Sequence, residues 1–261
     1  MTSSPQPVAL ITAGAAGIGA VLAHAFIESG YAVHVCDRDA KALEAFLAAT
    51  PGASGSLADV ADPVAVAAMF EDLERAHGRL DVLVNNAGIA GPTARIEDTT
   101  VEDWDHTIAV DLNSVFYVTR HAVPLLRNAG GGSIVNMSSN AGFFGFPYRL
   151  PYTASKWALI GITKTLAMEL GPAQIRVNAL CPGSVNGDRI DGVIQRDAQQ
   201  QGVEVETIRK LYARQSSLRT FVDPEDIAAM AVFLASAAGA KISGQAIAID
   251  GHTESLSNTS D

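Results

Sequence analysis

Two side chains four positions apart, Tyr152 and Lys156, have the types and the spacing of a general acid/base pair. Residues at i and i+4 share one face of a helix, and the surrounding sequence has a helical pattern. A phenol has a pKa of about 10 in water, and a nearby ammonium lowers such a pKa because it stabilises the phenolate. The pair therefore predicts proton transfer at Tyr152, with an ordinary surface tyrosine and lysine as the alternative. Tyr148 serves as a comparison, because no cation stands four positions after it.

A glycine-rich turn, with Gly14, Gly17 and Gly19, follows the first apolar run of the chain and precedes a helical stripe. Glycine lets the backbone approach a pyrophosphate, whose charge is stabilised at the N-terminus of the following helix. The turn therefore predicts a dinucleotide site. A few glycines alone are weak evidence, and an ordinary tight turn is the alternative.

Asp37 ends the second apolar run, about 20 residues after the glycines, where a carboxylate can accept hydrogen bonds from the ribose hydroxyls of adenosine. Its charge would repel a 2′-phosphate, so Asp37 favours NAD over NADP. The neighbouring Arg38 acts in the opposite direction, because a guanidinium attracts a phosphate. A solvated turn aspartate is the alternative for Asp37.

The segments that must position these residues alternate between apolar runs and helical stripes. Such alternation predicts a single α/β domain over residues 1–261, whose parallel sheet is covered by helices on both faces. Strands are expected at 8–11, 31–36, 54–60, 80–85, 133–138, 175–180 and 246–250, and helices at 18–26, 40–49, 63–77, 101–128, 151–170 and 224–234.

Two segments fall outside this pattern. Residues 184–222 show no regular periodicity and are longer than an ordinary connection, which predicts an irregular substrate lid. The tail at about 252–261 is polar and is expected to fray unless a partner subunit orders it.

Composition excludes several classes of protein. The 261 residues are 48% hydrophobic and carry a net charge of −10, without a cluster of basic residues, so a nucleic-acid partner is not expected. No run of about 18 apolar residues occurs, so we expect no membrane partner. Cys36 and Cys181 lack the spacing of metal ligands, so no metal site is expected. With no leader pattern at the N-terminus, a cytoplasmic location is expected.

The order and spacing of the short motifs together resemble the classical short-chain dehydrogenase/reductase superfamily, from about Val8 to Gly251. The resemblance implies a Rossmann-type doubly wound sheet of about seven strands, a nicotinamide cofactor and hydride transfer between nicotinamide and an alcohol or carbonyl substrate, and Asp37 makes NAD the expected form of that cofactor. The residues that carry it are Thr12-Ala13-Gly14-Ala15-Ala16-Gly17-Ile18-Gly19, Asp59-Val60, Asn85-Asn86-Ala87-Gly88, Asn113, Ser138-Ser139, Tyr152-Thr153-Ala154-Ser155-Lys156 and Pro182-Gly183.

The resemblance also implies a catalytic tetrad of Asn113, Ser139, Tyr152 and Lys156. Ser139 would hydrogen-bond the substrate oxygen, and Tyr152 would exchange a proton with that oxygen. Lys156 would lower the pKa of Tyr152 and hold the nicotinamide ribose, while Asn113 would position a water that links Lys156 to solvent. Ser138 is expected to have a structural role.

The same resemblance implies which residues bind the cofactor, and two departures from the family pattern affect them. Ala13 stands where the family has its first glycine, and Gly187 stands where a threonine often contacts the carboxamide, which would then rely on backbone groups or on Asn186. The implied cofactor-binding residues are Gly14, Gly17, Ile18, Gly19, Asp37, Asp59, Val60, Asn86, Ala87, Gly88, Tyr152, Lys156, Pro182, Gly183 and Val185.

The substrate side is less defined. Four aromatic residues between Ser139 and Tyr152 either line an apolar pocket or pack in the core and against a neighbouring subunit; they are Phe143, Phe144, Phe146 and Tyr148. Arg149 either meets an anionic substrate or is solvated, and we favour the solvated arginine. The arginines of the 184–222 segment are expected on a charged surface.

The function predicted from these observations is an NAD-dependent alcohol dehydrogenase or ketone reductase that acts on a small molecule. The alternative is a dinucleotide-sensing regulatory protein without turnover, although such a protein would not need Tyr152 and Ser139. A homotetramer or dimer is expected, because the helices near 112–126 and 152–170 are apolar on more than one face.

Overall fold

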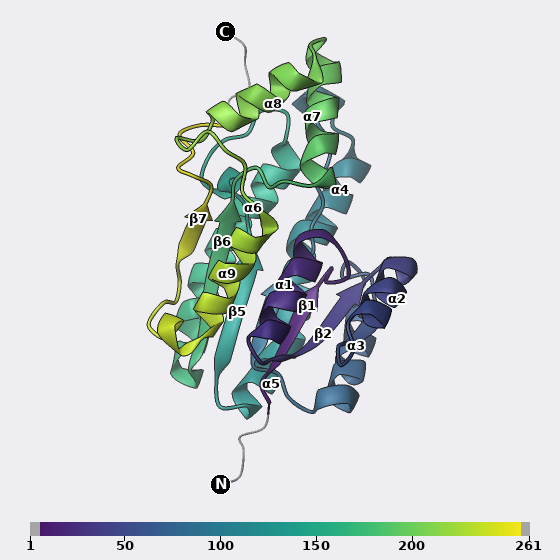
Figure 1. Cartoon of the computed structure of the whole chain (residues 1–261), viewed down its shortest axis with the longest axis vertical. Coiled ribbons are helices and arrows are strands. Elements are labelled where there is room, and N and C mark those ends of the chain that lie inside the picture. Colours follow the sequence, from purple (N-terminus) through teal and green to yellow (C-terminus); the bar gives the residue numbers. More distant parts are fainter. Residues whose placement is uncertain (1–5, 257–261) are drawn as a thin grey trace.

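The computed structural model describes residues 6–256, and within that range seven strands form one parallel sheet in the order β3-β2-β1-β4-β5-β6-β7 (Figure 1). From β1 the chain continues to β2 and β3 on one side of β1, and then crosses to β4 on the other side. The direction in which strands are added to the sheet therefore reverses between β1 and β4. Ligands of such sheets bind at the carboxyl ends of the strands next to this reversal. The strands are β1 (Val8–Thr12), β2 (Ala32–Asp37), β3 (Ser54–Leu57), β4 (Val82–Asn85), β5 (Gly132–Met137), β6 (Ile175–Pro182) and β7 (Ala246–Ile249).

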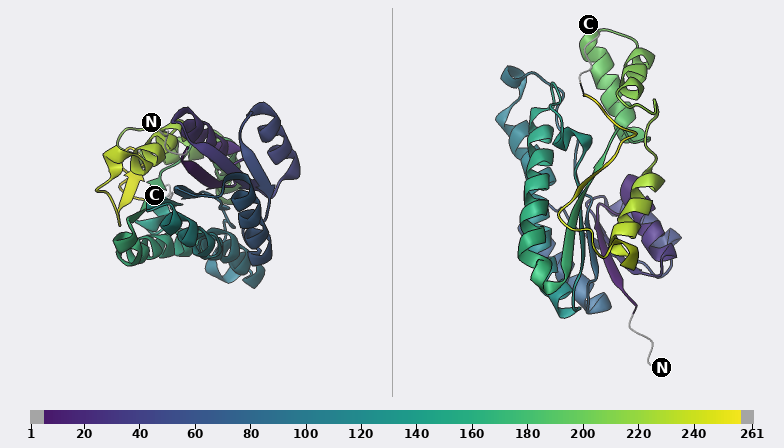
Figure 2. Two further views of the ribbon diagram at one scale, coloured as in Figure 1. Left: turned by 90° about the horizontal axis from the view of Figure 1, so that it is seen from below. Right: turned by 90° about the vertical axis from the view of Figure 1, so that its left-hand side faces the viewer.

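Helices cover both faces of the sheet, as the right-hand view of Figure 2 shows. One apolar core joins the sheet to α1 (Gly17–Glu28), α2 (Ala40–Ala49) and α9 (Pro224–Ala235). The other joins it to α3 (Pro63–His77), α5 (Ser114–Asn128) and α6 (Leu150–Leu170). The expected Rossmann-type doubly wound sheet is therefore confirmed.

The helix expected at 101–128 is divided into three parts. It consists of α4 (Val101–Ile108), a π-helical turn (Ala109–Asn113) and α5. A π-helical turn contains an extra residue per turn, so it shifts which side chains face the protein interior, and such turns are frequent at functional sites.

The expectation of an irregular 184–222 segment is wrong. This segment contains α7 (Asp188–Gln201) and α8 (Val205–Arg214), which lie beyond the carboxyl ends of the strands (Figure 1). The two helices share a small apolar cluster of their own, formed by Val193, Ile194, Ala198, Ile208 and Tyr212. Apolar residues are few in both helices, but they lie on one face of each, so an amphipathic pattern was present in the sequence and was missed.

The expected fraying of the tail is also wrong for the part that the structure describes. Thr253 and Leu256 are buried, and Thr253 pairs with Ser216 in a β-bridge. Asn140 Nδ2 donates a hydrogen bond to Thr253 Oγ1 over 3.3 Å. Residues 257–261 lie outside the described residues. Within the described range, no helix has the length and apolar character needed to cross a membrane.

Candidate active site

The glycine turn between β1 and α1 is built by close approach of backbone segments. A Cβ atom on Gly19 would come within 1.9 Å of the Ala13 carbonyl oxygen, and one on Gly14 within 2.7 Å of the Val35 side chain. Gly17 has a φ of 51°, and Ala13 adopts a similar left-handed φ of 49°. The alanine therefore retains the turn at the position where the family has glycine, at the cost of a conformation that glycine adopts more easily.

The N-terminus of α1 has the chemistry of an anion site. Ala16 occupies the N-cap position and has no side-chain oxygen to accept hydrogen bonds from the first-turn amides. Those amides face a cavity of about 470 Å³ that Ala16, Gly17 and Ile18 help to line. Unpaired first-turn amides bind phosphate groups well, so the turn fits a dinucleotide.

Asp37 lies at the tip of β2 beside this turn. Its carboxylate accepts hydrogen bonds from the amides of Ala15 (3.3 Å) and Asp39 (3.1 Å). Asp37 lines the large cavity and also a smaller neighbouring cavity, which Arg38 lines as well. Asp37 and Arg38, which act in opposite directions on the choice between NAD and NADP, therefore both line the smaller cavity.

Most of the expected cofactor residues line these two cavities. Two do not: Gly14 packs the turn against β2, and Lys156 lies buried behind Tyr152. The large cavity is lined by Gly17, Ile18, Gly19, Asp37, Asn86, Gly88, Tyr152, Pro182, Gly183 and Val185, and the smaller one by Asp37, Asp59, Val60, Ala87 and Gly88.

Asn86 has a structural role in addition to lining the cavity. Its side-chain nitrogen donates hydrogen bonds to the carbonyl oxygens of Thr12 (3.0 Å) and Ala13 (3.2 Å). The carboxyl end of β4 is thereby fixed to the glycine turn. Asn186, the other amide of interest, donates to Asp223 Oδ1 over 2.7 Å and so is tied to the N-cap residue of α9.

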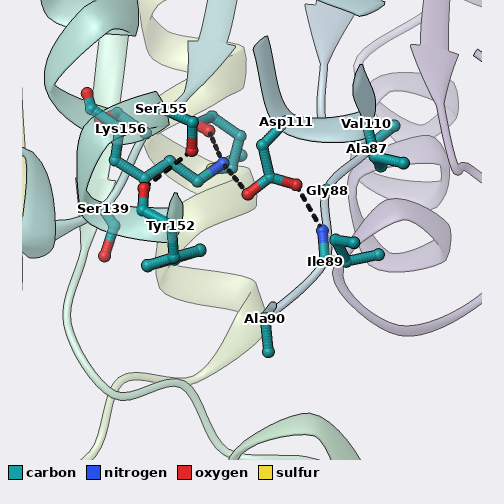
Figure 3. Close-up of polar contacts among 12 residues, drawn as sticks. Ala87, Gly88, Ile89, Ala90, Val110, Asp111, Ser139, Tyr152, Ser155 and Lys156 are labelled. Carbon is teal, nitrogen blue, oxygen red and sulfur yellow. Dashed lines mark hydrogen bonds and ion pairs between the residues drawn. The ribbon is translucent and has the colours of Figure 1, made fainter. Parts of the chain in front are cut away.

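Tyr152 and Lys156 come from the first two turns of α6 (Figure 3). The Lys156 ammonium lies 5.4 Å from the centre of the Tyr152 ring and donates a hydrogen bond to the Met137 carbonyl oxygen over 3.1 Å. Lys156 is only 4% exposed, so its positive charge acts on the phenol with little screening by water. This geometry suits a tyrosine that gives up and takes back a proton.

Ser139 lies at the carboxyl end of β5 and lines the same cavity as Tyr152. Its hydroxyl accepts a hydrogen bond from the Ala141 amide (3.1 Å) and donates to Asn140 Oδ1 (3.2 Å). The neighbouring Ser138 hydroxyl instead donates to the Lys156 carbonyl oxygen (2.9 Å), which fixes β5 to α6. Both serines line the cavity, but the Ser138 hydroxyl is bonded to the backbone of α6, whereas among the described residues the Ser139 hydroxyl is bonded only to its neighbours Asn140 and Ala141.

The structure brings Asp111, rather than the expected Asn113, to Lys156. Asp111 Oδ2 lies 3.6 Å from the Lys156 ammonium, whereas Asn113 lines neither cavity. Both residues belong to the π-helical turn, and side chains two positions apart in a helix point to different sides. The polar residue that faces Lys156 is therefore a carboxylate.

Asp111 is fully buried, with 0% of its surface exposed. Its Oδ1 accepts a hydrogen bond from the Ile89 amide over 2.6 Å, and its Oδ2, which has no hydrogen-bond partner among the described residues, forms the ion pair with the Lys156 ammonium (Figure 3). Gly88 gives this pair room, since a Cβ atom there would lie 3.3 Å from both Asp111 Oδ1 and Lys156 Nζ. One sequence signal for Asp111 exists: it stands four and seven positions before Val115 and Val118, so an acid lies on the helical face that these buried valines continue.

Arg149 is 3% exposed and lines the large cavity, so the expectation that it is solvated is wrong. Of the four aromatic residues before Tyr152, only Phe146 lines that cavity, while Tyr148 is 42% exposed.

Burial raises the pKa of the Cys36 thiol to about 12 and that of Cys181 to about 11, so neither is a nucleophile at neutral pH. The described residues contain no cluster of acids, histidines and cysteines fit to hold a metal ion.

Comparison with known proteins agrees with this geometry. The model of a family described as enoyl-(acyl carrier protein) reductase matches residues 13–252. The chain is 36% identical to D-threitol dehydrogenase of Mycolicibacterium smegmatis, over 94% of this chain and 91% of that one. The structure of an NAD+-bound xylitol dehydrogenase superposes with a TM-score of 0.91 at 26% identity, over 96% of this chain and 100% of that one. A variant of actinorhodin polyketide ketoreductase with NADPH superposes with a TM-score of 0.91 at 30% identity, over 97% and 98% of the two chains.

Proposed function

The chain belongs to the classical short-chain dehydrogenase/reductase superfamily and is an oxidoreductase, and from that premise we propose that it is an NAD-dependent dehydrogenase or ketone reductase of a small alcohol or carbonyl compound. One observation carries the proposal. Tyr152 and Ser139 lie on the wall of one cavity, and Lys156 is buried directly behind Tyr152.

The reaction needs a group that moves a proton at the substrate oxygen. That oxygen would lie between the Ser139 hydroxyl and the Tyr152 phenol, replacing Asn140 Oδ1 as the acceptor of the serine hydrogen bond. In reduction, Tyr152 donates a proton to the carbonyl oxygen, and in oxidation it accepts the proton of the alcohol. A positioned acid/base group of this kind contributes roughly 10²- to 10⁴-fold to the rate.

We assign Asp111, in place of Asn113, as the positioning residue for Lys156. The Ile89 amide fixes the Asp111 carboxylate, and the carboxylate in turn holds the ammonium 3.6 Å away, at the back of Tyr152. Lys156 thus keeps a charged partner in a place that water does not reach.

The residues around the glycine turn fit the two ends of a dinucleotide. The bound nicotinamide supplies or accepts the hydride. We assign the pyrophosphate to the amides of Gly17, Ile18 and Gly19, with Gly14 shaping the turn, and the adenosine ribose to Asp37. The adenine would contact Asp59, Val60 and Ala87, and Asn86 and Gly88 would also lie on the adenosine side. The nicotinamide nucleoside would contact Tyr152, Lys156, Pro182, Gly183 and Val185.

The preference for NAD rests on Asp37, which is held by two amide hydrogen bonds at the tip of β2 and whose charge repels a 2′-phosphate. Arg38 acts against it from the wall of the smaller cavity. A dinucleotide-sensing regulator is not favoured, because Tyr152 and Ser139 line one cavity with Lys156 behind Tyr152, and because the comparisons above are with enzymes.

We also propose a homotetramer or dimer that works in the cytoplasm. The exposed faces of α5 and α6 present large apolar side chains, such as Phe116 (57% exposed), Trp157 (52%) and Met168 (83%). A second copy would cover them. The two buried free cysteines suit a reducing compartment. We further propose that residues 184–222, with α7 and α8, close over the substrate as a lid.

The test is the change in absorbance of the reduced nicotinamide with a panel of alcohols and ketones, using NAD and NADP in parallel. Turnover that depends on substrate and is lost in Tyr152→Phe supports the proposal. Tight binding of NAD or NADP without turnover of any compound would favour the regulator instead.

A further inference from the structure

Arg149, which precedes α6, is a buried arginine with an unused donor. One terminal nitrogen donates a hydrogen bond to the Ala90 carbonyl oxygen over 2.6 Å, and the other lies 3.4 Å from Thr93 Oγ1. The third nitrogen, Nε, has no hydrogen-bond partner among the described residues, although the residue is only 3% exposed. Buried polar groups in native proteins nearly always have a partner, and buried charges most of all.

No carboxylate of the described residues lies within ion-pair distance of Arg149. The acid that acts on it most directly is Asp197, which is buried and accepts a hydrogen bond from the Tyr212 hydroxyl over 2.6 Å. Burial lowers the pKa of Arg149, an effect that Tyr152, Tyr212 and Asp197 oppose and that Arg196 reinforces. The guanidinium therefore carries its charge in a place where an additional anion would be favourable.

The position of Arg149 connects this charge to the reaction. The central carbon of its guanidinium lies 5.4 Å from the centre of the Tyr152 ring and 5.5 Å from that of Phe146. Arg149 lines the same cavity as Tyr152 and Ser139, together with the apolar side chains of Ile190 and Val193. Of the other charged residues on this wall, Asp37 lies at the glycine turn, and Asp188 and Arg189 lie side by side at the start of α7.

We propose that Arg149 binds a carboxylate of the substrate, so that the enzyme interconverts a small hydroxy acid and the corresponding oxo acid. A planar carboxylate matches the fork of N–H donors on a guanidinium, and the terminal nitrogen of Arg149 beside Thr93 has the longer hydrogen bond, 3.4 Å, to exchange for one to a ligand. In oxidation, the carbinol carbon loses a hydride to the oxidised nicotinamide, the hydroxyl loses its proton to Tyr152, and the carboxylate is unchanged. The inference rests on the proposed dehydrogenase function and narrows its substrate class.

The experiment compares three oxo acids with their methyl esters, which differ by one negative charge. The acids are pyruvate, acetoacetate and levulinate, and each is compared with its own methyl ester. In these three acids the carboxylate lies at three different distances from the ketone carbonyl. Reduction by NADH gives kcat/KM, and calorimetric titration of the NAD-loaded enzyme gives the affinity without turnover. We expect the acid of at least one pair to exceed its ester by about 10- to 100-fold in both measurements, the range typical of one charge-assisted hydrogen bond.

Arg149→Met should bring the acid-to-ester ratio close to one, and Arg149→Lys should retain part of it. The ratio within one variant does not depend on how much of that variant is folded. The matched control is Arg196→Met, which removes a nearby positive charge from an exposed position outside the cavity and should change the ratio less than about threefold. Equal use of acid and ester by the wild type, or an unchanged ratio in Arg149→Met, overturns the carboxylate site. Tight binding of the acid without turnover of any compound overturns the proposed dehydrogenase but supports the carboxylate site.

Discussion

Replacing Asp111 with Asn tests whether the buried Asp111–Lys156 pair is an energetically coupled unit. Asparagine keeps the shape of the side chain and removes its charge, which leaves the Lys156 ammonium buried without a charged partner. At the observed separation of 3.6 Å, an effective dielectric constant near 20 gives a Coulomb energy of about 5 kcal/mol. Breaking one side of a buried ion pair typically costs about 3–5 kcal/mol. We therefore expect Asp111→Asn to lower the free energy of unfolding by about 3–5 kcal/mol.

The assay is a double-mutant cycle with Lys156→Met, read by denaturant unfolding at one protein concentration. The double variant should be less destabilised than the sum of the single variants by about 2–4 kcal/mol, because removing both charges leaves none unpaired. The exposed pair of Lys210 and Glu206 on α8 provides the control. Its charged atoms are 3.8 Å apart, but its side chains are 67% and 66% exposed, so its coupling energy should stay below about 1 kcal/mol. Additive effects of Asp111→Asn and Lys156→Met would refute the reasoning.

Three further predictions concern catalysis, cofactor choice and acid stability. Tyr152→Phe should lower kcat by roughly 10²- to 10⁴-fold and leave the Kd for NAD within a few-fold, as measured by steady-state kinetics and by quenching of protein fluorescence; substantial residual activity would mean that the proton comes from another group. Asp37→Ala should narrow the ratio of kcat/KM with NAD to that with NADP by about tenfold or more, because it removes both the ribose hydrogen bonds and the repulsion of a 2′-phosphate; a wild type that uses NADP equally well would contradict the assignment. His34 is buried, and burial, with the neighbouring His77, lowers its pKa to about 4 from an ordinary 6.5. Between these two pH values the unfolded chain therefore binds a proton at His34 that the folded chain does not bind. The free energy of unfolding should fall by about 1.4 kcal/mol per pH unit as the pH drops from 6.5 toward 4. In His34→Gln this part of the pH dependence should disappear, and identical pH profiles of thermal unfolding in the two proteins would rule it out.

Local signals in the sequence were sufficient for most of the scaffold. The helices at 40–49 and 63–77 have the expected bounds, because Asp39 and Asp62 cap them and Pro63 begins the second. The spacing of Tyr152 and Lys156 also predicted their placement on one helix face. Such features depend on residues close together in the chain, which is why sequence alone reveals them.

The features that were missed depend on contacts between distant segments. The π-helical turn that brings Asp111 to Lys156 inserts one residue into a helix, and no local pattern distinguishes it from a regular turn there. The burial of Arg149 depends on the loop at Ala90, which lies 59 positions away in the chain. The packing of Thr253 depends on Ser216 and Asn140, which come from other parts of the fold.

The position of buried Leu256 near the end of the described residues fixes the order in which the parts of the site are synthesised. Leu256 is 3% exposed and forms part of the wall of the large cavity, whereas the glycine turn and Asp37 lie within the first 40 residues. A ribosome makes the N-terminal segments first, so the dinucleotide cradle is synthesised long before the last part of the substrate wall. A nascent chain that stops before Leu256 would retain every residue that we assign to the cofactor and still lack one apolar side chain of the substrate wall.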